Sequence, residues 1–436
     1  MNTRDRLDGG RAVVAARDAD ETPDTAEIRR LAVAAGFDVV GEVTQRRRED
    51  RRYHLGEGKA RELAAVASDA AADAVVVDGE LTPGQYTDLL ELLPAGTTLT
   101  DRYRLVLEIF ADGAGSAAAT TQVRLATLRY ELPRVRRATE ESLLNAATEK
   151  GSPVLDVERR IDDLERKLDG LTDAAADRRE RRREEGFDLV ALAGYTNAGK
   201  STLLRRLADD LDVESGDEAA DHGDLTGTAT TEDRLFETLE TTTRRATVDG
   251  RRLLLTDTVG LVADLPHDLV RSFSATLSEV GAGDAVLAVV DASADEARLR
   301  RRLETTVDVL AGDASGPVIP VVNKVDRLTD AERRTAAATV ADALADADVD
   351  THDPVTVSAR EGDGIGELRA ALSAALPREA ADLSVPNSGD ARSLVSWLHD
   401  RGDAEATYGA ETVEIRFAGR PAVVEEARRR AADLRE

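Results

Sequence analysis

The chain has 436 residues, a formal net charge of −27, no cysteine, and 42% hydrophobic residues. The length allows about two to four domains with ample core, and the lack of cysteine excludes disulfides and thiolate metal sites. The negative field disfavours a protein that binds nucleic acid over its whole surface at ordinary salt.

Only five of the 58 basic residues are lysine. An acidic, arginine-rich composition is typical of a halophilic protein, because at molar salt the Debye length is ~3 Å and acidic side chains repel little. The five histidines show no ligand spacing, so no zinc site is expected. The N-terminus lacks an apolar signal core, and no run approaches the ~20 apolar residues of a membrane span. We therefore expect a soluble, cytoplasmic protein without a membrane span.

Residues 1–112 alternate apolar runs with amphipathic helices, which predicts a small α/β domain with a parallel sheet. The expected strands cover residues 12–15, 38–43 and 74–77, and the expected helices cover residues 25–35, 59–68 and 82–93. A basic loop at residues 46–52 leads into Gly56-x-Gly58-Lys59. This loop fits a bound phosphate backbone or nucleotide as well as it fits a solvated surface loop, and both interpretations stay open.

Residues 113–186 predict an antiparallel helical hairpin, because apolar residues recur there at alternating steps of three and four. The two seams are Leu125, Leu128, Leu132 and Val135, and then Val154, Val157, Ile161, Leu164, Leu168 and Leu171. Pro133 is expected to kink the first helix, and the tip falls near residues 136–153. Arginines at 134–137 and 178–183 favour RNA contact, although interleaved glutamates also permit pairing along the helix.

Residues 187–378 carry the motifs of a nucleotide-binding domain. An apolar run at 188–193 leads into G-x-x-x-x-G-K-S, and a helical run follows at 202–207. Backbone N–H groups and the helix N-terminus favour phosphate at such a loop. Lys200 should reach the β- and γ-phosphates, and the Ser201 hydroxyl should hold Mg²⁺. The expected phosphate-loop residues are Gly194, Tyr195, Thr196, Asn197, Ala198, Gly199, Lys200, Ser201 and Thr202.

In this domain, strands are expected over residues 243–248, 253–255, 285–290, 318–322 and 355–357. The identity of the nucleotide base is predicted from motifs that follow the last two of these strands. The motif Asn323-Lys324-Val325-Asp326 places a carboxylate that can accept from guanine N1–H and from its exocyclic amine. Adenine lacks both donors, and an unpaired carboxylate in a dry site is costly. The other two polar residues of the motif should pack around the base and tie its loop to the phosphate loop. Backbone N–H groups near the guanine carbonyl should come from Ser358, Ala359 and Arg360.

The segment that senses the γ-phosphate is predicted to be Asp257, Thr258, Val259 and Gly260. Asp257 should contact a water of Mg²⁺, and the Gly260 N–H should contact the γ-phosphate. A second metal-binding hydroxyl should come from a nearby threonine, and spacing does not separate Thr238, Thr241, Thr242 and Thr243. Leu261 cannot orient a water as glutamine does, so intrinsic hydrolysis should be slow. His267 fits either a role near the γ-phosphate or a loop cap.

Residues 385–436 predict a small α+β domain without a catalytic signature. Within it, a helix, a strand and a second helix are expected over residues 394–399, 411–417 and 421–434.

Taken together, these motifs resemble those of the HflX family of GTPases over roughly residues 10–378. Residues 194–203 resemble the family's phosphate loop, 235–239 its first switch, and 257–260 with 265–277 its second switch. Stretches of the N-terminal half agree as well, at residues 31–36, 39–41, 45–47, 53–59 and 123–133. The implied fold is an α/β P-loop GTPase domain between a small α/β domain with a helical hairpin and a small α+β domain.

The resemblance implies a GTP hydrolase that binds GTP or GDP with Mg²⁺. It selects Thr238 beside Ser201 as metal ligand, with Asp257 acting through water, and it implies catalytic roles for Lys200, Thr238 and Gly260. It adds the nucleotide contacts Phe236, Glu237, Thr238, Leu239 and Glu240.

The implied partner is the large (50S) ribosomal subunit with its rRNA, on which well-studied members separate or rescue subunits. We expect a ribosome-associated monomer. Two features depart from the family: the tip at 137–153 is not rich in glycine, and Glu240-Thr241 replaces the usual Asp-Pro. The alternatives are an RNA-folding or tRNA-modifying GTPase that does not act on the ribosome, and an RNA-binding module that its nucleotide stabilises.

Overall fold

Apolar runs and amphipathic helices build two compact units along the chain, the first ending at Gly170 and the second beginning at Leu171 apart from short segments. The computed structural model describes residues 9–114, 116–143, 153–208, 242–257, 281–311, 315–345 and 350–435. Within the described residues, no helix is both long enough and apolar enough to cross a membrane.

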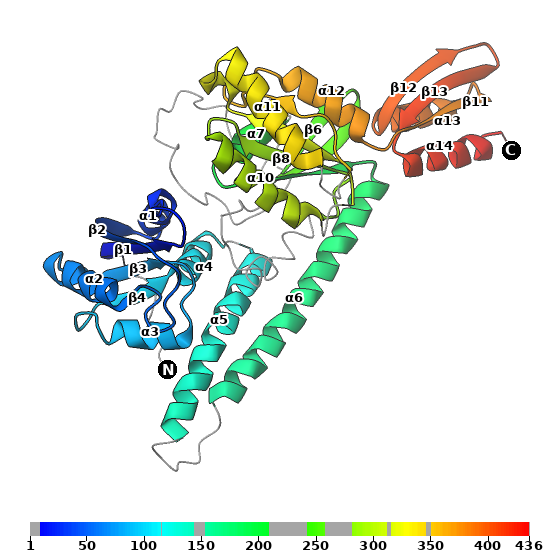
Figure 1. Cartoon of the computed structure of the whole chain (residues 1–436). Coiled ribbons are helices and arrows are strands. Elements are labelled where there is room, and N and C mark those ends of the chain that lie inside the picture. Colours follow the sequence, from blue (N-terminus) through cyan, green and yellow to red (C-terminus); the bar gives the residue numbers. More distant parts are fainter. Residues whose placement is uncertain are drawn as a thin grey trace. The chain divides into compact units, whose positions relative to one another are not determined.

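The first unit contains the predicted parallel sheet, with strand order β2-β1-β3-β4 (Figure 1). Its strands are β1 (Gly10–Asp18), β2 (Phe37–Arg46), β3 (Ala74–Asp78) and β4 (Thr98–Asp101), and its helices are α1 (Ala26–Ala34), α2 (Glu57–Asp69), α3 (Pro83–Leu90) and α4 (Arg102–Gly113). Buried valines and alanines of β1 and β3 form its centre. Helix α3 begins with a capping box between Thr82 and Gln85, and Pro83 suits its first position.

Two long helices form the predicted pair, α5 (Ala117–Leu143) and α6 (Pro153–Glu184), which lie side by side (Figure 1). Ion pairs of 2.7 Å join them from Arg129 to Glu165 and from Arg136 to Glu158. The second seam contains the two buried residues of α6, Ile161 and Leu168. Helix α5 continues through Pro133 without ending there.

The second unit contains a six-stranded sheet in the order β10-β9-β8-β5-β7-β6, parallel throughout except for the β6–β7 pair. Its strands are β5 (Asp188–Gly194), β6 (Thr242–Val248), β7 (Arg251–Asp257), β8 (Ala285–Asp291), β9 (Val318–Asn323) and β10 (Val355–Thr356). The described helices are α7 (Lys200–Leu207), α10 (Glu296–Ala311), α11 (Asp330–Ala345) and α12 (Ile365–Ala375), with a 3-10 turn η1 at Val325–Arg327.

Helices cover both faces of this sheet, as expected of an α/β domain. Leucines of α7 and α12 pack with β5, β7 and β8 in one core, while α10 and α11 pack against β8 and β9 in another. The carboxyl ends of β5, β7, β8 and β9 therefore meet at one edge, where ligands of open α/β sheets bind. The polar residues that the sequence singled out follow these strands.

The C-terminal residues form an antiparallel sheet in the order β11-β13-β12 with two helices, which confirms an α+β element. The elements are β11 (Glu379–Pro386), α13 (Gly389–His399), β12 (Gly402–Tyr408), β13 (Thr412–Gly419) and α14 (Pro421–Asp433). The sheet begins at Glu379, before the predicted start at residue 385, because Ala381, Leu383 and Val385 of β11 belong to its core.

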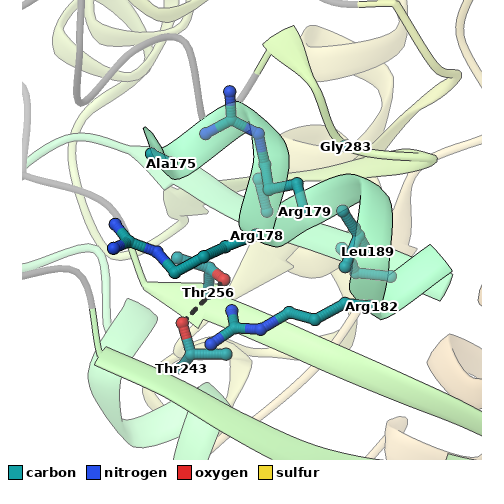
Figure 2. A pocket seen from close by; sticks show the side chains of 10 residues that line it. Ala175, Arg178, Arg179, Arg182, Leu189, Thr243, Thr256 and Gly283 are labelled. Carbon is teal, nitrogen blue, oxygen red and sulfur yellow. Dashed lines mark hydrogen bonds between the residues drawn. The ribbon is translucent and has the colours of Figure 1, made fainter. Parts of the chain in front are cut away.

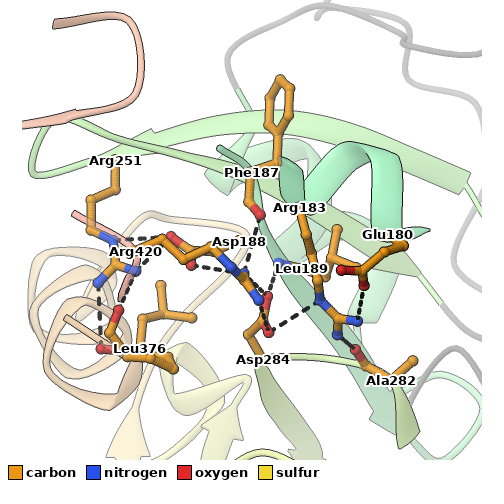
Figure 3. A network of polar contacts seen from close by, with 11 residues as sticks. Glu180, Arg183, Phe187, Asp188, Leu189, Arg251, Ala282, Asp284, Leu376 and Arg420 are labelled. Carbon is orange, nitrogen blue, oxygen red and sulfur yellow. Dashed lines mark hydrogen bonds and ion pairs between the residues drawn. The ribbon is translucent and has the colours of Figure 1, made fainter. Parts of the chain in front are cut away.

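A buried polar network joins this sheet to β5 and β8 within the second unit (Figure 3). Arg420 donates to Asp284 with Nη2–Oδ1 at 2.8 Å and also contacts Asp188 at 3.3 Å. Arg251, which is 2% exposed, holds the other side of Asp188 with Nη2–Oδ2 at 2.6 Å. Removing one partner of such a network is costly, because the remaining buried charges are then less well compensated. The network therefore stabilises the position of the C-terminal sheet against β5 and β8.

Candidate nucleotide-binding site

The phosphate-loop motif lies between β5 and α7, in the strand–loop–helix order that the sequence predicts. Gly194 has φ +143°, and a Cβ there would lie 2.2 Å from the backbone oxygen of Val289. Gly199 has φ +94°, and its Cβ would lie 2.3 Å from Nδ2 of Asn323. Only glycine satisfies both the dihedral angle and the close approach at these two positions.

Lys200 is the first residue of α7, and its side chain lies inside the loop. Its ammonium donates to the backbone oxygens of Gly194 at 2.9 Å and Tyr195 at 3.2 Å, and the residue is 7% exposed. Burial lowers the pKa of Lys200, and the nearby charge of Asp257 opposes that shift. The loop thus surrounds one cationic group with backbone, as a phosphate-binding loop requires.

Ser201 and Asp257 come together from α7 and from the last residue of β7. The Ser201 hydroxyl donates to Oδ2 of Asp257 at 2.5 Å, and Asp257 is 3% exposed. A hydroxyl and a carboxylate are the hard oxygen ligands that Mg²⁺ prefers. The donor set therefore fits the predicted metal, which would be held by Ser201 directly and by Asp257 through a water.

Asn323, the last residue of β9, links the three nucleotide motifs. Its amide donates to the Ala198 backbone oxygen at 2.8 Å, and its side-chain oxygen accepts from the Ala359 backbone N–H at 3.0 Å. Asn323 is 2% exposed, so these bonds are shielded from water. One side chain thus fixes the segment after β10 against the phosphate loop.

The remaining polar residues of this edge form two pairs. The Ser358 hydroxyl donates to Oδ1 of Asp326 at 2.7 Å, and the Lys324 ammonium donates to Oδ2 of Asp291 at 2.9 Å. Burial by itself raises the pKa of Asp291, but hydrogen bonds from Ser293 and the charge of Lys324 outweigh it and lower that pKa. Asp291 was not predicted, although its signal was an acidic residue directly after the apolar strand at 285–290.

The structure also orients Thr243, one of the predicted candidates for a metal-binding hydroxyl. Thr243 pairs with Thr256 across β6 and β7, with the two hydroxyl oxygens 3.1 Å apart. Thr256 directly precedes Asp257, and successive strand residues point to opposite faces. Thr243 therefore lies on the face away from Asp257, which removes it as a candidate.

Several predicted residues lie outside the described residues. They are Phe236, Glu237, Thr238, Leu239, Glu240, Thr241, Thr258, Val259, Gly260, Leu261 and His267. Arg360 is described and exposed, and its backbone oxygen accepts from Arg206.

Two family models match the chain. One is described as GTP-binding GTPase N-terminal and matches residues 23–111. The other is described as 50S ribosome-binding GTPase and matches residues 189–324. The second match begins in β5 and ends one residue beyond β9, so it covers the phosphate loop and Asn323.

Curated relatives extend the similarity over most of the chain. A GTPase HflX of Thermococcus kodakarensis is 35% identical over 380 residues, which make up 85% of this chain and 80% of that protein. A GTPase HflX of Caldanaerobacter subterraneus subsp. tengcongensis is 37% identical over 330 residues, or 73% and 72% of the two chains. The crystal structure of SsGBP with GDP is 21% identical with a TM-score of 0.48, covering 84% of this chain and 98% of that one. The sequence relatives alone show that the protein belongs to the GTPase HflX family and is a guanine-nucleotide-binding GTPase.

Proposed function

We propose that residues 194–202, 323–326 and 358–360 form the guanine-nucleotide site of this GTPase, and that its nucleotide state sets its residence on the large ribosomal subunit. The observation that carries the site is a pair of hydrogen bonds: the Asn323 amide donates to the Ala198 backbone oxygen, and its side-chain oxygen accepts from the Ala359 backbone N–H. They hold the phosphate loop and the two base-recognition segments in one rigid arrangement. Pre-organised groups of this kind bind a ligand with a smaller ordering cost.

In this proposal, Asp326 selects the base. Ser358 holds one carboxylate oxygen of Asp326 at 2.7 Å, which restricts its rotation. A carboxylate held in this way can accept from guanine N1–H and the exocyclic amine together, whereas adenine offers it no donor there. Lys324, tied to Asp291, keeps the motif's backbone in place at φ +66°.

The phosphates of GTP are assigned to the loop around Lys200, whose ammonium would exchange its backbone acceptors for β- and γ-phosphate oxygens. Ser201 and Asp257 (the latter through water) are assigned to Mg²⁺, together with Thr238. When bound, Mg²⁺ supplies positive charge beside the phosphates. Gly260 is assigned to the γ-phosphate through its backbone N–H.

We assign the low basal rate of GTP hydrolysis to the residue at position 261. Leucine there has no polar group to orient the attacking water, so the basal rate should be low and a bound partner should raise it. Multiple-turnover phosphate release with and without large ribosomal subunits tests this expectation. A fast rate without subunits would show that another residue, such as His267, positions the water.

The proposed partner follows from the family model described as 50S ribosome-binding GTPase, which covers residues 189–324. The arginines of α5 and α6 offer groups for contact with rRNA phosphates. Within this role, we propose that the protein separates or rescues ribosomal subunits and acts as a monomer. The tip at 137–153 differs from the glycine-rich form, so subunit separation needs its own test.

Sucrose-gradient sedimentation tests the ribosome proposal. The full chain is mixed with ribosomes in molar KCl, with either a non-hydrolysable GTP analogue or GDP. We expect it to migrate with the large subunit when the analogue is bound and to stay at the top with GDP. Absence from the large-subunit fractions in both states contradicts the proposal. A fall in the 70S peak only in the analogue sample would further support subunit separation.

A further inference from the structure

A polar cavity of about 60 Å³ lies between the C-terminal part of α6 and one face of the six-stranded sheet (Figure 2). Helix α6 contributes Ala175 and three arginines, and the sheet contributes hydroxyls from β6 and β7 above the apolar wall of β5. All of these residues belong to the second unit. The lining residues are Ala175, Arg178, Arg179, Arg182, Leu189, Val190, Ala191, Thr243, Thr256 and Gly283.

Arg178, Arg179 and Arg182 gather on one side of α6 because residues three and four positions apart share a helix face. No carboxylate is among the lining residues. In the described part of the chain, the structure records no hydrogen bond or ion pair of the Arg178 or Arg182 side chain. The next arginine differs, since Arg183 is paired with Glu180 and Asp284 at 3.5 Å each. Like charges at this spacing destabilise a helix, and an anion between them would reduce their repulsion.

The opposite wall supplies groups that also suit an anion. The hydroxyl oxygens of Thr243 and Thr256 lie 3.1 Å apart, and Figure 2 shows them facing the arginines. A hydroxyl both donates and accepts, so when one threonine accepts from the other it can turn its own proton toward the cavity. Guanidinium groups and hydroxyls around one small space are the donors that bind tetrahedral oxyanions.

We propose that this cavity binds a free phosphate-type oxyanion through Arg178, Arg182 and the Thr243–Thr256 pair. One water needs about 10–15 Å³ of such space, so about 60 Å³ gives room for an ion of the size of phosphate or sulfate. The site is distinct from the nucleotide site, because Thr256 and Asp257 are consecutive residues of β7 that point to opposite faces.

Binding there would join α6 to the two strands that border the nucleotide site. Thr256 directly precedes Asp257 on β7, and Thr243 is the second residue of β6. An oxyanion held by both walls fixes the last turns of α6 against these strands. We therefore expect the bound ion to raise the unfolding temperature of the protein.

Isothermal titration with inorganic phosphate, at constant ionic strength set by KCl, tests the site. The protein is saturated with GDP, so that the phosphate loop is occupied and does not contribute. The test variant is Arg178→Gln with Arg182→Gln, because glutamine keeps helix propensity while removing charge. The matched control is Arg181→Gln, an exposed arginine of the same helix that does not line the cavity.

We expect saturable binding of one phosphate by the wild type and by Arg181→Gln, and at least tenfold weaker binding by the double variant. The unfolding temperature should rise with phosphate in the first two proteins only. Equal phosphate affinity in all three proteins overturns the proposal. So does a loss of phosphate affinity in Arg181→Gln as large as the loss in the double variant. Dimethyl phosphate is the second probe because it presents a diester, as a nucleic-acid backbone does. Tighter binding of that probe than of inorganic phosphate would also overturn the assignment to a free oxyanion.

Discussion

The Ser358 hydroxyl donates to the Asp326 carboxylate at 2.7 Å. Ser358 follows β10 and is fully buried, whereas Asp326 follows β9 and is half-buried. The contact fixes one oxygen of the residue that we assign to guanine recognition. It also couples two motifs that lie 32 positions apart in sequence. The geometry of the base site therefore depends on how β9 and β10 pair.

Lys200→Ala should weaken GTP binding by roughly 100-fold or more, about 3 kcal/mol, because it removes the buried ammonium of the phosphate loop. The measurement is titration of a fluorescent GTP analogue. Lys167→Ala, which removes an exposed lysine of α6, is the control and should bind as the wild type does. Equal affinity in the Lys200 variant would refute the assignment of the loop.

Gly194→Ala should destabilise the second unit by about 3 kcal/mol. The added Cβ would meet the Val289 backbone oxygen at 2.2 Å, and the φ of +143° strains any side chain. Gly366→Ala on α12 is the matched control, since its Cβ meets nothing within 4 Å. The control should gain about 0.4–1 kcal/mol. The measurement is the urea midpoint of unfolding for both variants. Similar midpoints would contradict this geometry of the phosphate loop.

Arg420→Ala should cost about 3 kcal/mol of folding free energy. Among the described residues, buried Asp188 then keeps only Arg251 as a cationic partner, and Asp284 keeps only the 3.5 Å contact with Arg183. Arg416→Ala removes an exposed ion pair with Asp382 and should cost less than about 1 kcal/mol. Both are measured by urea denaturation. If the two variants lose the same amount, the network of Figure 3 does not anchor the C-terminal sheet.

The first unit should lose stability in mild acid because of His54, which is 2% exposed. Burial and the charge of Arg17 lower the pKa of His54, against the opposing effect of Glu49. The unfolded state then binds a proton that the folded state resists, so the free energy of unfolding falls as the pH drops from about 6.5 towards the lowered pKa.

His54→Asn should remove that pH dependence, and asparagine tolerates the φ of +66° at this position. Urea midpoints of wild type and variant at pH 7.5 and 5.5 provide the comparison. Relative to the midpoint of the variant, the urea midpoint of the wild type should be lower at pH 5.5 than at pH 7.5. A difference that stays constant with pH would show that folding does not lower the pKa of His54.

The strands that line the nucleotide site were predictable because β5, β8 and β9 are continuous apolar runs, as expected of strands buried on both faces. β4 was not predicted, since Thr98–Asp101 is four residues long with one large apolar side chain. β12 was missed because its inward residues are small, as at Ala404 and Ala406.

The motif residues were identified from sequence because their spacing is local to each strand end. Their partners were not, since the bond from Asn323 to Ala198 and the pairing of Lys324 with Asp291 depend on strand order. The orientation of Thr243 likewise follows from its register with Thr256. Which face a strand residue occupies becomes clear only once its neighbours are known.

We propose that Asp326 makes this a guanine site, and the binding of GTP, ATP and XTP to wild type and Asp326→Asn tests this role most directly. Asparagine has no charge and keeps only one acceptor oxygen, so it loses one hydrogen bond to guanine and weakens the other, which should reduce GTP affinity roughly 100-fold in the variant. XTP should gain, because asparagine can donate to the xanthine oxygen that replaces the guanine amine. Asp330→Asn, an exposed neighbour, should behave as wild type. An unchanged ratio of GTP to ATP affinity in Asp326→Asn would contradict the claim.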